Sequence, residues 1–317
     1  MSIPRATQCL VTLSKKLEVA RLVYSFFLAL PPRQFLRPFY AVLDRALGNM
    51  SNLQELSLIL GLPITRNFPK VEAISKELTK LTCYTHTQDP HFLPSLLLDQ
   101  PGIEELNILC GPAAIANLSP EALPALKCLH SPIWLLPMLL PSRLSHLSRL
   151  VIQEPMNSDA DLRELSTALE EGTSPESMEL DICMDLASCL MTPEIVSLGL
   201  SVLGSRAPFI HHLTVRLRGP IQQDQLLGMF SPALPSFSSL GTLIITPQLP
   251  TPELYYPPEY VQAQSQCNQA GDVFHDTLWH RQVIREWRRT NPALACVIFP
   301  IGKYIHVGRG SEGSEGV

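Results

Sequence analysis

A short apolar pattern recurs along the chain and constrains its fold more than any other feature. Each copy holds an apolar residue, two spacers, a second apolar residue, one spacer and a third, as in Leu53-x-x-Leu56-x-Leu58. The middle residues stand at positions 26, 56, 81, 106, 129, 150, 180, 213, 243 and 297, and most neighbours are 21 to 33 residues apart. Leucine-rich repeats have periods of roughly 20–29 residues, so the spacing indicates a repeat protein. The last interval, 54 residues, leaves room for one missing or replaced copy.

The pattern predicts a short strand in every copy. Alternate side chains of a strand point to one face, so the second and third apolar residues of each copy would enter a common core. One copy cannot bury its apolar face alone, and stacked neighbours bury it together. We expect the following residues to be buried on successive parallel strands: Leu56, Leu58, Leu81, Leu106, Ile108, Leu150, Ile152, Leu213, Val215, Leu243 and Ile245.

Apolar residues at helical spacing lie between several copies of the pattern. They occur within residues 35–47, 93–97, 162–169 and 195–203, and Ser158 offers an N-cap to the third of these segments. Strands that alternate with helices favour an α/β class with right-handed crossovers. The predicted fold is therefore an irregular leucine-rich-repeat-like solenoid with parallel strands and outer helices. Leucine-rich α/β enzymes are the alternative, because their strands and helices give similar patterns.

The repeats and their interruption divide the chain into five predicted parts. These are an N-terminal lead-in (1–20), the repeat array (21–246), a Pro/Tyr/Gln-rich insertion loop (247–271), a C-terminal helix-strand cap (272–307) and a disordered tail (308–317).

The insertion loop carries the candidate partner-binding residues Tyr255, Tyr256 and Tyr260. Exposed aromatic side chains are common anchors of protein interfaces. The alternative is that these tyrosines pack the loop back onto the array.

The cap is predicted to hold one amphipathic helix over residues 272–289, followed by a strand at 294–299. Arginines gather in the last helical turn, where a cation favours the helix dipole. The apolar side of the helix is expected to comprise Phe274, Leu278, Trp279, Val283 and Trp287.

The charge is spread unevenly along the chain. The net charge is −5, with Lys and Arg exceeding Asp and Glu by five both in residues 1–50 and in residues 281–309. Residues 51–280 hold 11 basic against 24 acidic residues, or −13. An acidic centre could attract a basic partner, although ordinary surface solubility gives the same pattern. The overall charge gives no reason to expect nucleic-acid binding.

The cysteines and the apolar segments indicate the cellular compartment in which the protein is expected. The eight cysteines include no C-x-x-C pair and mostly lie in apolar runs, which favours buried free thiols in a reducing compartment. The apolar run at residues 22–31 is shorter than a membrane helix needs, and it fits a buried strand better than a signal peptide. We therefore expect a cytoplasmic or nuclear protein with no membrane partner.

No motif with a known catalytic mechanism is present. The sequence lacks G-x-x-x-x-G-K-S/T, G-x-G-x-x-G, H-E-x-x-H and G-x-S-x-G. His275 and His280 are five residues apart, so they do not share a helix face as paired metal ligands would. We expect no enzyme activity and no catalytic, cofactor-binding or metal-binding residues.

Three segments carry a resemblance to a known family. They are residues 22–28, residues 39–40 together with 46–53 (which begin Ala46-Leu47-Gly48-Asn49), and residues 78–83 with Leu78-Thr79-Lys80-Leu81; the end from Trp287 to Pro300 is similar as well. The sequence resembles the leucine-rich-repeat region of fungal F-box-type proteins over most of its length. Members of that family dock a Skp-type adaptor of a cullin ubiquitin ligase through an N-terminal F-box and hold a substrate with the repeats.

The resemblance implies a protein-recognition module that acts as the substrate-receptor part of an SCF-type ubiquitin ligase, with an unknown protein as its substrate. About twenty residues precede Arg21, and they contain no Leu-Pro-x-Glu-like F-box opening. We therefore expect no tight binding of the adaptor to this chain. The alternative function is that of an α/β hydrolase or transferase with unrecognised motifs.

Overall fold

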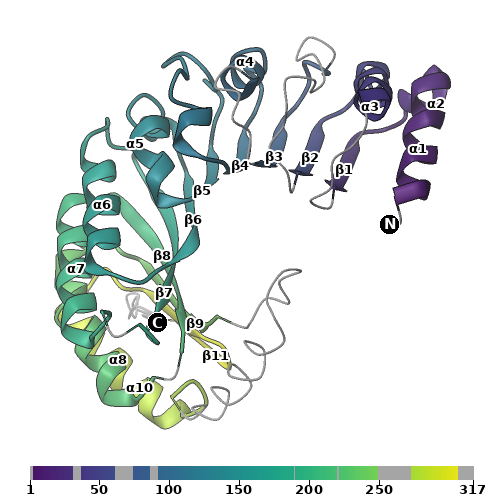
Figure 1. Ribbon diagram of the computed structural model, residues 1–317. Helices are drawn as coiled ribbons and strands as arrows, with labels where there is room; N and C mark the ends of the chain where they lie inside the picture. The colour runs from purple at the N-terminus through teal and green to yellow at the C-terminus, as the bar shows by residue number, and fades with distance from the viewer. Residues whose placement is uncertain are drawn as a thin grey trace, which may run out of the picture. The chain divides into compact units, whose positions relative to one another are not determined.

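The computed structural model describes residues 3–30, 37–60, 74–85, 92–188, 190–219, 221–248 and 273–305. These residues form an α/β structure in which eleven strands make one mostly parallel sheet, and strand order in the sheet is the order in the sequence. The chain divides into two compact units, Met1–Leu150 and Val151–Val317. Most of the strands and helices of both are labelled in Figure 1.

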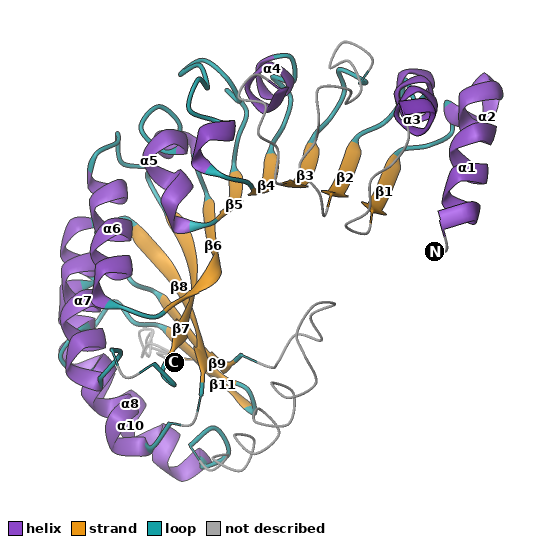
Figure 2. Cartoon of the chain, in the orientation of Figure 1, coloured by secondary structure: helices purple, strands orange, loops and turns teal. Residues whose placement is uncertain are grey.

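In the first unit, the helices that connect successive parallel strands lie on one side of them (Figure 2). The strands are β1 (Ser25–Leu30), β2 (Glu55–Leu60), β3 (Lys80–Thr85), β4 (Glu105–Leu109) and β5 (Cys128–Ser131). The helices are α1 (Ile3–Lys15), α2 (Leu17–Ala20), α3 (Arg37–Asn49), α4 (Phe92–Leu98) and α5 (Leu136–Leu139), with short 3-10 turns η2 (Pro112–Ala114), η3 (Ile133–Leu135) and η4 (Leu144–His146).

The strands of the first unit pair without any shift between matching copies of the apolar pattern. Leu56 lies opposite Leu81, and Leu81 lies opposite Leu106. Each of these side chains is at most 1% exposed. The apolar residue of one strand therefore rests against that of the next, as the shared spacing predicts.

The predicted core positions are confirmed. All eleven residues named from the pattern are buried, and all lie on strands. The helices expected near residues 35–47, 93–97, 162–169 and 195–203 are also present.

Two helices in the lead-in, α1 and α2, were not apparent from the repeat pattern. Asn49, the last residue of α3, donates from Nδ2 to the carbonyl oxygens of Leu13 and Ser14 at 3.0 and 3.1 Å. These bonds satisfy two carbonyls at the end of α1, where a helix has no internal donors left. They fix α1 against α3.

The second unit continues the alternation of strands and helices. Its strands are β6 (Arg149–Met156), which begins at the boundary, β7 (Met178–Asp185), β8 (Ile210–Arg218), β9 (Thr242–Pro247), β10 (Cys296–Phe299) and β11 (Gly302–Ile305). Its helices are α6 (Asp159–Glu170), α7 (Pro193–Arg206), α8 (Gln223–Phe230) and α10 (Thr277–Thr290), with the 3-10 turn η5 (Leu234–Ser236). Ser158 is the N-cap of α6 and forms a capping box with Asp161, in agreement with the sequence.

Strand β10 pairs directly with β9, and Val297 lies opposite Leu243. The long interval between these two copies of the pattern therefore separates neighbouring strands. Strand β11 was not predicted, and it runs antiparallel to β10.

The predicted helix of the cap was wrong at its start and on part of its apolar side. Helix α10 begins at Thr277, because Asp276 caps it by accepting from the backbone N–H groups of Leu278 and Trp279. Phe274 is buried but precedes the helix. Leu278 is 72% exposed, since it lies on the side of the helix opposite the buried residues Val283 and Trp287.

The expectation of buried thiols holds for part of the cysteines. The described cysteines are all free, and Cys83, Cys110 and Cys183 are buried. Burial raises the pKa of Cys83 and Cys110 to about 12. Cys9 is exposed on the amphipathic helix α1, so the expectation was wrong there. Cys189 and Cys267 lie outside the described residues.

A buried histidine joins α10 to the last two strands. The His280 side chain is fully buried, and its ring stacks on Phe299 with centroids 3.9 Å apart. Its Nε2 lies 2.7 Å from the Val273 carbonyl oxygen, and its Nδ1 lies 3.1 Å from the Tyr304 hydroxyl. Because a carbonyl oxygen only accepts, Nε2 carries the hydrogen and Nδ1 accepts from Tyr304. Burial lowers the pKa of His280.

Gln100 is a buried polar residue at a repeat position that is otherwise mostly apolar. In several copies the residue three before the first apolar residue accepts a hydrogen bond at its carbonyl oxygen from the N–H of that apolar residue, as Gln100, Met50 and Phe237 do. Gln100 is 1% exposed. Among the described parts of the chain, neither Oε1 nor Nε2 of its side chain has a hydrogen-bond partner.

Leu106→Ala is expected to lower the free energy of unfolding by roughly 2–5 kcal/mol, because it empties a fully buried site on β4. Urea denaturation followed by circular dichroism measures the change. Leu98→Ala on α4 is the control, since Leu98 is 51% exposed and should shift stability by at most about 0.5 kcal/mol. Equal effects of the two substitutions would show that β4 does not line the core.

Gln100→Met is expected to raise the free energy of unfolding by about 1–2 kcal/mol. The substitution keeps the length of the side chain and removes two buried groups without partners. Urea midpoints of the variant and parent measure the effect, with the exposed residue Gln54 replaced by Met as the control. A loss of stability in Gln100→Met alone would mean that the amide has a partner, such as a bound water.

Stability is expected to fall as the pH drops below about 6.5. The pKa of His280 is lower in the folded chain than in the unfolded chain. As the pH falls, the unfolded chain therefore binds a proton at this histidine first, and this proton binding favours unfolding. The contribution cannot exceed about 1.4 kcal/mol per pH unit. Urea midpoints between about pH 7.5 and 5.5 should vary less in His280→Gln than in the parent, whereas His146→Gln, at an exposed site, should keep the dependence. An unaltered dependence in His280→Gln would assign it to other groups.

Candidate functional site

The strands of the first unit have a second face, formed by the side chains that alternate with the core positions. We call it the open face. Its first row comprises Ser25, Glu55, Lys80, Glu105 and Cys128, its second row Phe27, Ser57, Thr82, Asn107 and His130, and its third row Ala29, Ile59, Tyr84 and Leu109. All of these residues are exposed or half-buried, so the face is accessible along the described strands.

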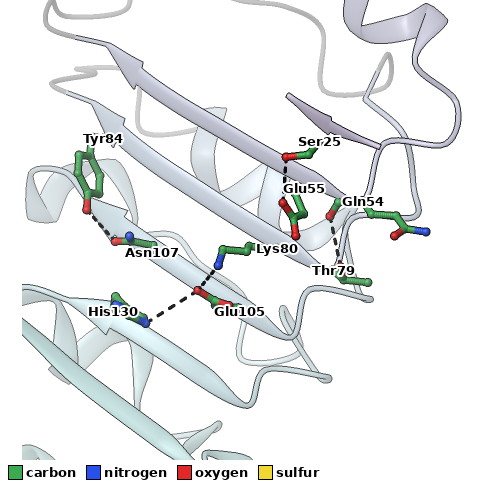
Figure 3. Close-up of polar contacts among 9 residues, drawn as sticks. All are labelled: Ser25, Gln54, Glu55, Thr79, Lys80, Tyr84, Glu105, Asn107 and His130. Carbon is green, nitrogen blue, oxygen red and sulfur yellow. Dashed lines mark hydrogen bonds and ion pairs between the residues drawn. The ribbon is translucent and has the colours of Figure 1, made fainter. Parts of the chain in front are cut away.

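The first row is a row of charges. Lys80 Nζ lies 2.7 Å from Glu105 Oε1, and His130 Nε2 lies 4.0 Å from the same oxygen (Figure 3). The hydrogen bond that Lys80 donates to Glu105 raises the pKa of Lys80. On β1, Ser25 Oγ donates to Glu55 Oε2 at 2.9 Å. Lys80 and Glu105 are about one-third exposed or more, so the pair contributes about 0–1 kcal/mol to stability and mainly orders the two side chains.

The second row is mostly polar, and the third row is apolar and aromatic. The Tyr84 hydroxyl donates to Asn107 Oδ1 at 3.0 Å, which fixes the ring over β4 (Figure 3). Ile59 and Leu109 lie on either side of Tyr84 in the third row. At the β1 end, Phe27 is 66% exposed. The third, apolar and aromatic row therefore runs parallel to the charged first row on the same sheet, with the mostly polar second row between them.

The open face brings together one group of titratable residues, Lys80, Glu105, Cys128 and His130. A thiol, an imidazole and a carboxylate are the residue types of a cysteine hydrolase. In such an enzyme the carboxylate orients the imidazole, whereas Glu105 binds the Lys80 ammonium more closely than it approaches His130. These contacts fit a polar binding surface better than a catalytic group. The described residues contain no cluster of three or more potential metal ligands.

The second unit has its own polar pairs on strands β7 and β8. Arg216 Nε donates to Asp181 Oδ1 at 2.8 Å, and Arg218 Nε lies 3.8 Å from Asp185 Oδ2. Burial raises the pKa of the neighbouring thiol of Cys183 to about 11. The two guanidinium groups are therefore paired with carboxylates. The Cys183 thiol is protonated at neutral pH because burial raises its pKa.

The site residues expected from the sequence, Tyr255, Tyr256 and Tyr260, lie outside the described residues. Their role as an interface anchor stays a prediction. None of the helices in the described ranges is long and apolar enough to cross a membrane.

The charged row was not identified from the sequence. Glu55, Lys80 and Glu105 each stand just before the middle apolar residue of a copy, so the pattern places them on the face away from the core. The alternation of side chains between the two faces of a strand predicts that placement. Their mutual pairing could not be predicted in this way, because it depends on the alignment of strands 25 residues apart.

No protein-family model matches the chain, and no curated protein matches it.

Proposed function

We propose that the chain is a leucine-rich-repeat-like solenoid that recognises another protein through the open face. The observation that carries this proposal is the alignment of successive strands, which puts the core residues of each copy on one face and a different, varied set on the other.

Repeated backbone bonds support the solenoid architecture. The N–H groups of Gln54 and Glu55 both donate to the carbonyl oxygen of Tyr24, at 2.9 and 3.0 Å. The same arrangement links Thr79 and Lys80 to Gln54. It recurs at β4 and β5 as well, so the chain enters strands β2 to β5 in the same way, as units of a repeat protein do.

The character of the open face favours a protein partner. Protein interfaces combine aromatic and apolar contacts with polar groups at their rim, and the rows of Tyr84 and Glu105 offer both. The side chains are held by hydrogen bonds and an ion pair within the face, so less conformational entropy is lost when a partner binds. The charges would mainly set the association rate and its salt dependence.

The role of substrate receptor in an SCF-type ubiquitin ligase rests on the resemblance to F-box-type proteins alone. A pull-down with a purified Skp-type adaptor tests it. We expect no stoichiometric capture of the adaptor by this chain at micromolar concentration, because residues 1–20 contain no Leu-Pro-x-Glu-like motif. Capture would assign the chain to the ligase directly.

A comparison of open-face and helix-face variants tests the recognition proposal. Ser57→Arg with Thr82→Arg would place two long cations in the centre of the open face, and partners captured by the parent chain should be lost. Ala41→Arg with Ser95→Arg, at exposed positions of α3 and α4, adds the same charge elsewhere and should retain them. Quantitative mass spectrometry of the captured proteins measures the difference, after circular dichroism has shown that both variants fold. Equal capture by the two variants would contradict recognition through the open face.

A further inference from the structure

Helix α10 presents a row of three arginines on its outward side. Arg281, Arg285 and Arg289 are four residues apart and all exposed. Four residues of an α-helix rise about 6 Å and turn about 40° beyond a full turn, so the three side chains lie within one arc of about 80°. The buried residues Val283 and Trp287 lie on the other side of the helix.

Nothing within the described residues uses this row. The ion pairs and hydrogen bonds found there include none from Arg281, Arg285 or Arg289. Arg288 differs, because its guanidinium donates to the carbonyl oxygens of Leu294, Ala295 and Tyr304. That arginine has a structural role in holding the last strands.

The row also weakens the helix that carries it. Like charges four residues apart destabilise a helix, and the dipole favours cations only in the last turn, which leaves Arg281 and Arg285 without that benefit. Glu286 is the one acidic residue in the helix. The row lowers the stability of the helix, although the chain as a whole has a net charge of −5. Binding of another molecule by the three arginines would account for it.

An apolar residue extends the row at its N-terminal end. Leu278 lies three residues before Arg281, on the same arc, and is 72% exposed. We define Leu278, Arg281, Arg285 and Arg289 as the arginine face of α10.

We propose that the arginine face docks an acidic amphipathic helix of a partner protein, with carboxylates four residues apart and an apolar residue at one end. A second helix has the same rise of about 6 Å per four residues, so its carboxylates meet the three guanidinium groups one to one when it packs antiparallel. Guanidinium groups bind carboxylates through two parallel hydrogen bonds. This contact is separate from the open face and does not depend on the proposed function.

Two features favour an acidic helix over a phosphate polymer or a lipid surface. Leu278 offers an apolar contact that a phosphodiester backbone does not match. The acidic balance of the whole chain would also repel a long polyanion, whereas a short helix touches only the arginine face.

A synthetic helix is the probe for this contact. The peptide is capped, rich in alanine and about 18 residues long, which is sufficient for partial helicity. It carries Glu at three positions four apart and Leu three residues after the last Glu. A second peptide has the same composition with the Glu residues spread around the helix. Fluorescence anisotropy with the full chain should show at least about tenfold weaker binding of the second peptide.

Charge reversal on the protein gives the matched test. Arg281→Glu with Arg285→Glu should weaken binding of the first peptide at least about tenfold. Arg5→Glu with Arg45→Glu changes the net charge equally at exposed positions of α1 and α3 and should leave the affinity unchanged. A peptide with Lys in place of Glu should bind the first variant better than the parent. Circular dichroism shows whether each variant is folded.

Three results would overturn the proposal. Equal binding of the two Glu peptides would mean that the spacing is not recognised. Unchanged affinity in the Arg281/Arg285 variant would place the contact elsewhere. Tighter binding of a fluorescent oligodeoxythymidine, or of vesicles containing phosphatidylserine, than of the first peptide would show that the face serves a nucleic acid or a membrane surface.

Discussion

The structure depends on the burial of one strand's apolar side chains against those of the next. Leu56, Leu81 and Leu106 lie opposite one another on adjacent strands and are almost completely buried. Burying a leucine side chain is worth roughly 1.5–3 kcal/mol, but only when a neighbouring copy covers it. Each strand therefore requires the one beside it, and the spacing of the apolar pattern must be kept for the ladder of strands to form.

This constraint leaves the opposite face of each strand free to vary. On the open face, Glu105 binds Lys80 and Tyr84 binds Asn107, while the core positions behind them stay apolar. A single α/β scaffold can thus carry different combinations of charge and aromatic surface without loss of its core. The arginine face of α10 shows the same separation, because Val283 and Trp287 hold the helix and its outer side is left for other contacts.

Buried polar side chains bind backbone carbonyl oxygens in the turns that connect helices and strands. Asn291 donates from Nδ2 to the carbonyl oxygens of Leu234 and Phe237, at 3.0 and 2.9 Å, and so ties the chain after α10 to the loop that follows α8. In the first unit, the buried guanidinium of Arg143 donates to three carbonyl oxygens, including those of Ser119 and Ala122. Both residues satisfy carbonyls that the helices and turns leave open. Gln100 occupies the equivalent position to Asn291, but its amide makes no such bonds to the described residues.

The sequence by itself determined where strands β1 to β10 lie and most of their buried residues, since a strand repeats every two residues and its core positions are mostly apolar. It also determined helix α6 and its cap at Ser158, which depend on local contacts alone. Tertiary structure decided what depends on residues distant in sequence. The exposure of Leu278 and the bond between His280 and Tyr304 follow from packing of the helix on β10 and β11. The pairing of Lys80 with Glu105 likewise required the alignment of two strands, and no local pattern encodes which residues of separate strands come to lie side by side.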